Sequence, residues 1–166
     1  MTTPDERWHR RIADLWAAFD DHEPQAFLAK VKELTSELPS GNGIAEYELA
    51  SAHDSIGHEA EAAMHYRRAF AAGLPDSHRR RATIQFASTL RNLGEAEESV
   101  RLLAAEREAG SDELDDAVTA FLALALTDLD RDREAAALAL GALSRHLPRP
   151  ILAGTRTLRS SASSRE

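Results

Sequence analysis

The chain has 166 residues, which suffices for one domain or a short array of repeats. Asp and Glu outnumber Lys and Arg by 28 to 20, and the net charge of -8 predicts no nucleic-acid partner, because the field of the protein repels phosphate. The absence of cysteine excludes disulfides, thiolate metal sites and a cysteine nucleophile. The sequence has no long apolar run and no hydrophobic leader, so we expect a cytoplasmic protein without a membrane segment.

The amino-acid composition favours helices over strands. Ala occurs 31 times and Leu 21 times, whereas Val occurs three times and Ile five times. Ala and Leu are good helix formers, while the β-branched residues Val and Ile prefer strands. We therefore predict an all-α protein whose helices approach each other closely across small alanine side chains.

Two interleaved series of helix breakers divide the sequence into repeats. The breakers Gly57, Gly94 and Asp130 stand 36 or 37 residues apart, and turns with Leu-Pro or Gly-Ser-Asp recur at the same interval between them. Apolar residues between the breakers recur every three or four residues, which is typical of amphipathic helices. In chain order, the expected helices span residues 5–19, 24–38, 44–55, 60–72, 82–93, 95–109, 114–129 and 133–147.

Paired in order, these helices predict four helix-turn-helix hairpins in one repeat domain over residues 1–147. The hairpins span about 5–38, 44–74, 79–109 and 112–147, and we expect residues 148–166 to form a flexible tail. Aromatic side chains such as Trp8 and Trp16 suit the first hairpin to a capping role. Two helix starts have local signals, since Pro24 fits a first helical turn and Ser111 precedes a run of acidic residues as an expected N-cap.

Small residues at fixed places make the hairpins resemble the tetratricopeptide repeat. With Gly57 as the turn, Ala50, Ala62, Tyr66 and Ala69 fall at places that this repeat fills with packing side chains. The pattern returns one repeat later, except that Glu106 replaces the usual small residue. The same positions recur in the sequence as follows: Ala87, Ser99 and Leu103 around the second turn, and Ala123, Ala135, Ala139 and Ala142 around the third.

The strings at residues 48–62 and 87–94 are more specifically similar to the bacterial tetratricopeptide repeat group 5 family. The resemblance implies a right-handed superhelical stack of about four hairpins, an α-solenoid. It also implies protein interaction and a possible homodimer, with no catalytic residues and no cofactor to carry over. The chain itself lacks the common nucleotide-binding, hydrolase and metalloprotease motifs, so we expect no enzyme activity.

The first helices of such repeats line the concave surface of the stack, where a ligand peptide would lie. Polar side chains there can hydrogen-bond an extended backbone or a carboxylate, and an aromatic ring offers a face for an apolar side chain. The predicted peptide-binding or protein-binding residues are Tyr47, Ser51, Asp54, Arg81, Gln85, Ser88, Arg91, Asn92 and Thr127.

Charge is unevenly distributed along the chain. Residues 65–94 contain six Arg or Lys residues and one acidic residue, whereas the segments on either side are acidic. A basic patch there could receive an acidic partner or the acidic part of a second copy. Alternatively, these side chains are ordinary solvated charges that contribute little. The arginines concerned are Arg67, Arg68, Arg79, Arg80, Arg81 and Arg91.

Two alternatives to an adaptor come from other functional classes. The stack could be a regulatory module that senses a peptide or small ligand, whose binding would raise the melting temperature. Less favoured is a metal-dependent enzyme built on His53, His58, Glu61 and His65, whose spacing along one helix face can suit a divalent metal. Since the same residues fit a packing position and a polar outer helix face, we predict no metal site.

Overall fold

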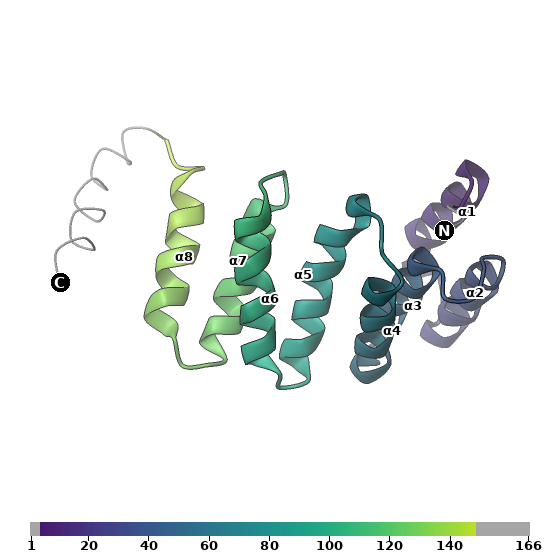
Figure 1. Cartoon of the computed structure of the whole chain (residues 1–166), viewed down its shortest axis with the longest axis horizontal. Helices are drawn as coiled ribbons and strands as arrows, with labels where there is room; N and C mark the ends of the chain where they lie inside the picture. The colour runs from purple at the N-terminus through teal and green to yellow at the C-terminus, as the bar shows by residue number, and fades with distance from the viewer. Residues whose placement is uncertain (1–3, 149–166) are drawn as a thin grey trace.

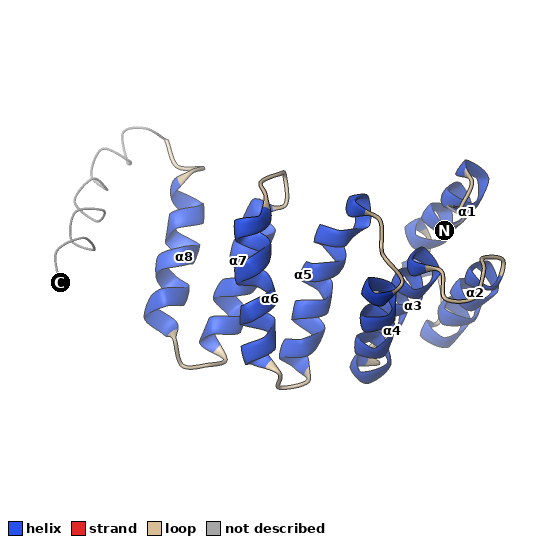
Figure 2. Ribbon diagram, viewed as in Figure 1, coloured by secondary structure: helices blue, strands red, loops and turns tan. Residues whose placement is uncertain are grey.

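The structure, a computed structural model, describes residues 4–148, where the elements are helices joined by loops and turns, with no strand (Figure 2). A short 3-10 helix, η1 (Phe19–Asp21), follows the first α-helix. In chain order, the eight α-helices of the described residues are α1 (Glu6–Ala17), α2 (Pro24–Ser36), α3 (Gly43–Ser55), α4 (Glu59–Ala71), α5 (Asp76–Asn92), α6 (Ala96–Ala109), α7 (Asp115–Thr127) and α8 (Asp132–Ser144). The all-α prediction is confirmed.

The helices stack in chain order into an elongated solenoid, with α1 and α8 at opposite ends (Figure 1). Consecutive helices pack on each other, and α5 also contacts α3 and α7, so the first helices of the last three hairpins are neighbours. Nowhere between residues 4 and 148 is a helix both long enough and apolar enough to cross a lipid bilayer.

Most packing positions that the repeat pattern predicts are buried, but in the third repeat Ala139 is exposed and Ala142 half-buried, because α8 is the last described helix and packs mainly on α7. Ala50, Ala62, Tyr66 and Ala69 have no exposed surface, and the corresponding Ala87, Ser99 and Leu103 of the next repeat are equally buried. Close helix packing of this kind requires small side chains at the crossing points, because a larger one would push the axes apart.

The hydrophobic core consists of two clusters that meet at α5. The first spans α1 to α5 and includes Phe27, Tyr66 and Phe86. The second spans α5 to α8 and is made mainly of aliphatic side chains such as Leu103 and Leu122. Because α5 contributes to both clusters, it is the structural link between the two halves of the solenoid.

Two helix starts differ from the sequence-based expectation. Helix α5 begins at Asp76, six residues before the first apolar residue of its periodic pattern, Ala82, because its first turns are polar and partly exposed. The expected N-cap Ser111 does not cap α7, which begins at Asp115. Instead, Asp112 accepts a hydrogen bond from the backbone N–H of Leu114 at 2.8 Å.

The tight turn inside each of the last three hairpins requires a backbone with positive φ. Gly94 has φ of 80°, and an added Cβ would meet no atom within 4 Å, so the cost of a side chain there is purely conformational. We expect Gly94→Ala to lower the free energy of unfolding by about 1 kcal/mol. The same change at Gly141, inside α8 with equally open surroundings, should raise it by about 0.5 to 1 kcal/mol.

Urea denaturation of the two alanine variants and the wild type measures whether the free energy of unfolding changes in opposite directions. Equal effects of Gly94→Ala and Gly141→Ala would contradict a conformational origin.

Candidate functional site

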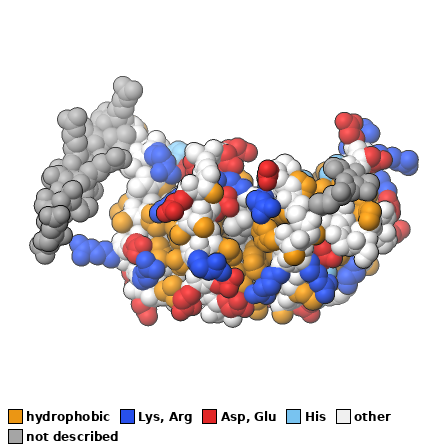
Figure 3. All heavy atoms as spheres, in the orientation of Figure 1, with side chains coloured by type: hydrophobic (Ala, Val, Ile, Leu, Met, Phe, Trp, Pro, Cys, Tyr) orange, Lys and Arg blue, Asp and Glu red, His pale blue; other side chains and the backbone are white. Residues whose placement is uncertain are grey.

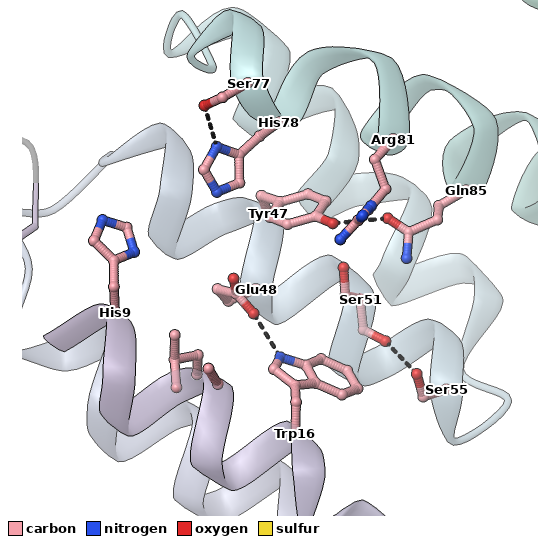
Figure 4. Close-up of a pocket in the computed structure, with 12 residues that line it drawn as sticks. His9, Trp16, Tyr47, Glu48, Ser51, Ser55, Ser77, His78, Arg81 and Gln85 are labelled. Atoms are coloured by element: carbon pink, nitrogen blue, oxygen red, sulfur yellow. Dashed lines mark hydrogen bonds between the residues drawn. The ribbon is translucent and has the colours of Figure 1, made fainter. Parts of the chain in front are cut away.

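One cavity of about 540 Å³ lies on the face formed by the first three odd-numbered helices (Figure 4). Helices α1, α3 and α5 each contribute four residues to its lining, so the cavity exists only because these helices are neighbours in the stack. Its size is within the range of ligand sites in proteins, about 300 to 1,000 Å³. The lining residues are His9, Ile12, Ala13, Trp16, Tyr47, Glu48, Ser51, Ser55, Ser77, His78, Arg81 and Gln85.

A buried carboxyl group lies in the wall of this cavity. The side chain of Glu48 is 7% exposed and lies between the rings of Trp16 and Tyr47 (Figure 4). Trp16 Nε1 donates a hydrogen bond to Glu48 Oε2 at 2.7 Å. Burial raises the pKa of Glu48 above its usual value, and the hydrogen bond from Trp16 opposes this shift only in part.

Tyr47 connects the carboxyl group to α5. Its hydroxyl donates a hydrogen bond to Gln85 Oε1 at 3.0 Å, and its ring meets His78 edge to face with centroids 5.5 Å apart. Burial, and secondly the nearby Glu48, raise the pKa of the Tyr47 hydroxyl, so it remains a neutral hydrogen-bond donor.

The mouth of the cavity carries basic side chains. His9 comes from α1, whereas His78 and Arg81 come from α5 (Figure 4). Burial lowers the pKa of His78, and the charges of His9 and Arg81 lower it further. Arg81 is exposed and is therefore the permanent positive charge at this mouth.

The predicted binding residues divide into two groups. Tyr47, Ser51, Arg81 and Gln85 meet in the cavity. The other five predicted residues do not line it. Three of them interact within the chain: Asp54 accepts a hydrogen bond from the Thr89 hydroxyl at 2.9 Å, Arg91 pairs with Asp128, and the Thr127 hydroxyl donates to the Leu124 carbonyl at 2.7 Å. Ser88 is half-buried, and Asn92 is exposed at the end of α5. A role of the nine residues in binding stays a prediction.

Sequence reasoning missed the contribution of α1 and of the buried carboxyl group. Trp16 and His9 belong to a helix that the sequence assigns to capping, and Glu48 has no sequence signal that separates it from a solvated acidic residue. Only the crossing of α1 over α3 brings Trp16 and Glu48, 32 residues apart, into contact.

The arginines of the expected basic patch are mostly engaged within the chain. Arg80, Arg67, Arg79 and Arg91 each form an ion pair with a carboxylate of the same chain. Acidic and basic side chains accordingly alternate over the surface in Figure 3 instead of separating into one patch. In the described part of the chain, Arg68 and Arg81 are the members of the patch without an ion pair.

The histidines of α3 and α4 lie together but are arranged as stacked rings. His53 stacks on His65 with centroids 5.4 Å apart, and His65 Nδ1 lies 2.7 Å from Glu46 Oε2. Among residues 4–148, no three or more His, Asp or Glu side chains are placed to hold a metal ion. The geometry therefore gives no support to the metal-dependent alternative.

The buried histidine His53 makes stability depend on pH. Burial lowers its pKa below 6.5, and the charges of His65, Lys32 and His58 add to this effect while Glu61 opposes it. The unfolded chain therefore takes up a proton near pH 6.5 that the folded chain accepts only at lower pH. This contribution to stability is present above pH 6.5 and is lost as the pH falls below it.

We expect the melting temperature to decrease as the pH is lowered from about 7.5 to about 5.5. The decrease should be smaller in His53→Gln than in the wild type. Some dependence should remain in that variant, because burial also lowers the pKa of His78. Scanning calorimetry at several pH values measures both slopes. An unchanged slope in His53→Gln would contradict the assignment.

Comparison with known proteins agrees with this architecture. Residues 43–156 match the family model TPR_5, described as tetratrico peptide repeat. Two crystal structures of MamA are similar in fold. One has a TM-score of 0.63 at 17% identity over 82% of this chain and 71% of that chain, and the other a TM-score of 0.64 at 16% identity over 84% and 78%. No curated protein sequence matches this chain significantly.

The stacked hairpins and the hollow face of their first helices define a helical-repeat protein of the interaction class. The chain belongs to the tetratrico peptide repeat family, as the resemblance in its sequence predicts. Proteins of this family typically act as interaction modules without catalysis.

Proposed function

We propose that this chain is a non-catalytic adaptor of the bacterial cytoplasm that binds a protein or peptide segment on the concave face of its first helices. The observation that carries the proposal is the shared cavity, to which α1, α3 and α5 contribute equally. A segment lying across these three helices would meet aromatic surface at Trp16 and Tyr47 and hydrogen-bonding groups at Gln85 and Ser55. Such a mixture suits an extended peptide.

On this proposal, four of the remaining predicted residues would extend the binding surface beyond the cavity. Ser88, Arg91 and Asn92 follow Gln85 on α5, and Thr127 lies on α7, which packs against α5. A longer segment would run from the cavity toward α7 over these side chains. The expectation of an acidic partner stays a prediction that now depends on Arg68 and Arg81.

A random-peptide display selection on the immobilised full chain tests the adaptor proposal. Selected peptides should bind the wild type and lose at least tenfold in affinity for Ser55→Trp, which adds a large ring to the lining of the cavity. Ser36→Trp is a matched control: both serines end a helix, are exposed and donate their hydroxyl to a backbone carbonyl.

The control also separates two locations, because Ser36 lines a second cavity of about 450 Å³. Loss of binding in Ser36→Trp alone would move the ligand there and contradict the assigned face. A selection that yields no binding peptide would reject the adaptor proposal.

A sensing module for a small ligand is the second candidate, and the buried carboxyl of Glu48 inside the cavity favours it. Such a ligand would raise the melting temperature of the chain by mass action. A screen of cationic and neutral metabolites by thermal shift, with Ser55→Trp as the negative control, distinguishes this function from peptide binding.

We also propose self-association through α8. Leu140 and Leu143 on this helix are 63% and 53% exposed. Large apolar side chains exposed close together are typical of interaction surfaces. We expect the wild type to sediment as a dimer at tens of micromolar and Leu140→Glu with Leu143→Glu to sediment as a monomer. Met64→Glu, at an exposed position of α4, serves as the control and should remain dimeric. A monomeric wild type would remove the proposal.

A further inference from the structure

The carboxyl group of Glu48 has no charge partner, although burial makes its ionised form costly. In the described part of the chain, its one hydrogen bond comes from the neutral indole of Trp16. Burial and that hydrogen bond are the two causes that set its pKa, with no contribution from a basic side chain. Buried carboxylates in proteins are normally paired, since an unpaired one loses its hydration without compensation. A cationic ligand would supply the missing partner.

The surroundings of this carboxyl group suit a cation on a long apolar stem. The rings of Trp16 and Tyr47 lie on either side of Glu48 (Figure 4). Ile12 adds aliphatic surface to the same lining. An ammonium or guanidinium group gains from a nearby aromatic face as well as from the carboxylate. The methylene groups of the stem would pack on the apolar part of the wall.

We propose that this cavity binds the basic side chain of a peptide segment, a Lys or Arg, with Glu48 as its counter-ion and the rings of Trp16 and Tyr47 flanking it. The proposal rests on the proposed function, because the same segment lies on the concave face. Arg81 stands at the mouth of the cavity, and its positive charge opposes a cation entering it. The attraction of Glu48 must therefore exceed this repulsion.

Two tryptophans give this proposal a direct readout. The chain contains two, and each indole N–H has a defined acceptor: Glu48 for Trp16, and the buried backbone carbonyl of Leu34 for Trp8 at 2.9 Å. In a proton–nitrogen correlation spectrum of the labelled full chain, a ligand at Glu48 shifts the Trp16 indole signal. The Trp8 signal stays in place and also reports that a variant remains folded.

The probes are four acetylated and amidated pentapeptides of alanine with Lys, Arg, Leu or Glu at the centre. We expect the Lys and Arg peptides to shift the Trp16 signal with dissociation constants at least tenfold lower than those of the Leu and Glu peptides. Butylamine is a fifth probe. If it binds as tightly as the Lys peptide, the cavity takes a free amine and the commitment to a peptide side chain is overturned.

Two variants that change the charge of the cavity in opposite directions test the proposal further. Glu48→Gln keeps the size of the side chain and should weaken binding of the Lys peptide at least tenfold, whereas Arg81→Gln should strengthen it. Glu61→Gln makes the same change in charge at an exposed position of α4 outside the cavity and should have no effect. A preference for the Glu peptide, with binding weakened by Arg81→Gln and strengthened by Glu48→Gln, would overturn the proposal.

Failure of this inference is distinguishable from failure of the proposed function. If displayed peptides bind and are blocked by Ser55→Trp, but show no preference for Lys or Arg and no sensitivity to Glu48→Gln, the adaptor stands and the basic-side-chain site is rejected. If none of the five probes shifts the Trp16 signal, the inference is rejected regardless of the display selection.

Discussion

Replacing Phe27 with alanine is expected to lower the free energy of unfolding by about 3 to 5 kcal/mol. The side chain of Phe27 is completely buried at the start of the solenoid. Its ring lies edge to face with Trp16 and Phe19, at centroid distances of 4.9 and 4.8 Å. The cost therefore combines the lost burial of the ring, the cavity left behind and two lost aromatic pairs.

Urea denaturation followed by circular dichroism measures the effect of Phe27→Ala. Met64→Ala is the control, because Met64 is 39% exposed and lies outside the proposed dimer interface on α8, so its truncation should change stability by less than about 1 kcal/mol. A loss below about 1 kcal/mol in Phe27→Ala would contradict the packing of the first hairpin. Because Trp16 packs on Phe27 and contacts Glu48, the same variant should also bind the basic peptide more weakly.

The second large effect is expected at Arg80, which joins α5 to the end of α6 and the start of α7. Its guanidinium group lies 2.9 Å from Asp112, 2.6 Å from Asp115 and 3.5 Å from Glu106, and donates a hydrogen bond to the Gly110 carbonyl at 3.1 Å. The side chain of Arg80 is 12% exposed. Arg80→Met would leave the three carboxylates close together without a counter-ion.

We expect Arg80→Met to lower the free energy of unfolding by about 2 to 3 kcal/mol, less than for a fully buried ion pair because two of the carboxylates are partly exposed. Arg131→Met removes an exposed pair within one helix turn and should cost less than about 0.5 kcal/mol. Adding Glu106→Gln to Arg80→Met should restore part of the loss, as a double-mutant cycle in urea measures. Additive effects would show that Arg80 and Glu106 do not interact.

Glu106 also illustrates how tertiary structure corrects a reading of the repeat pattern. In sequence it departs from the small residue expected at that place of the repeat. In the structure it lies half-buried and pairs with Arg80, so the charge is compensated from the preceding helix. Arg80 itself appears in the sequence as one member of a run of basic residues, with nothing to separate it from Arg81, which remains unpaired in the described part of the chain.

Most of the fold could be predicted because its determinants are local. Apolar residues at helical intervals define the helices, Gly57 and Gly94 occupy the turns with positive φ, and alanines mark the crossings of the helices. Asp130 takes a similar backbone conformation with φ of 56° in the turn that the sequence predicts there. The start of α5 is harder to predict from sequence, because its first turns are polar and interrupt the periodic pattern on which the prediction depends.

The candidate site could be predicted only in part. Tyr47, Ser51, Arg81 and Gln85 were found because they follow the regular spacing of first helices. The buried carboxyl of Glu48 was not, because an acidic residue in a helix is ordinarily solvated and its burial here depends on α1 lying across it.

The sequence by itself determined the helical repeat, its turns and most of the buried small residues, since these follow from periodicity and from backbone conformations that individual residues prefer. The tertiary structure alone decided which charges are paired and which side chain is isolated. Arg80 pairs with carboxylates that lie more than 30 residues away in the chain. Glu48 accepts a hydrogen bond from the indole of Trp16 on another helix but pairs with no cation in the described part of the chain. Such outcomes depend on distances between elements far apart in the chain, because electrostatic and desolvation energies are set by the final packing and not by local spacing.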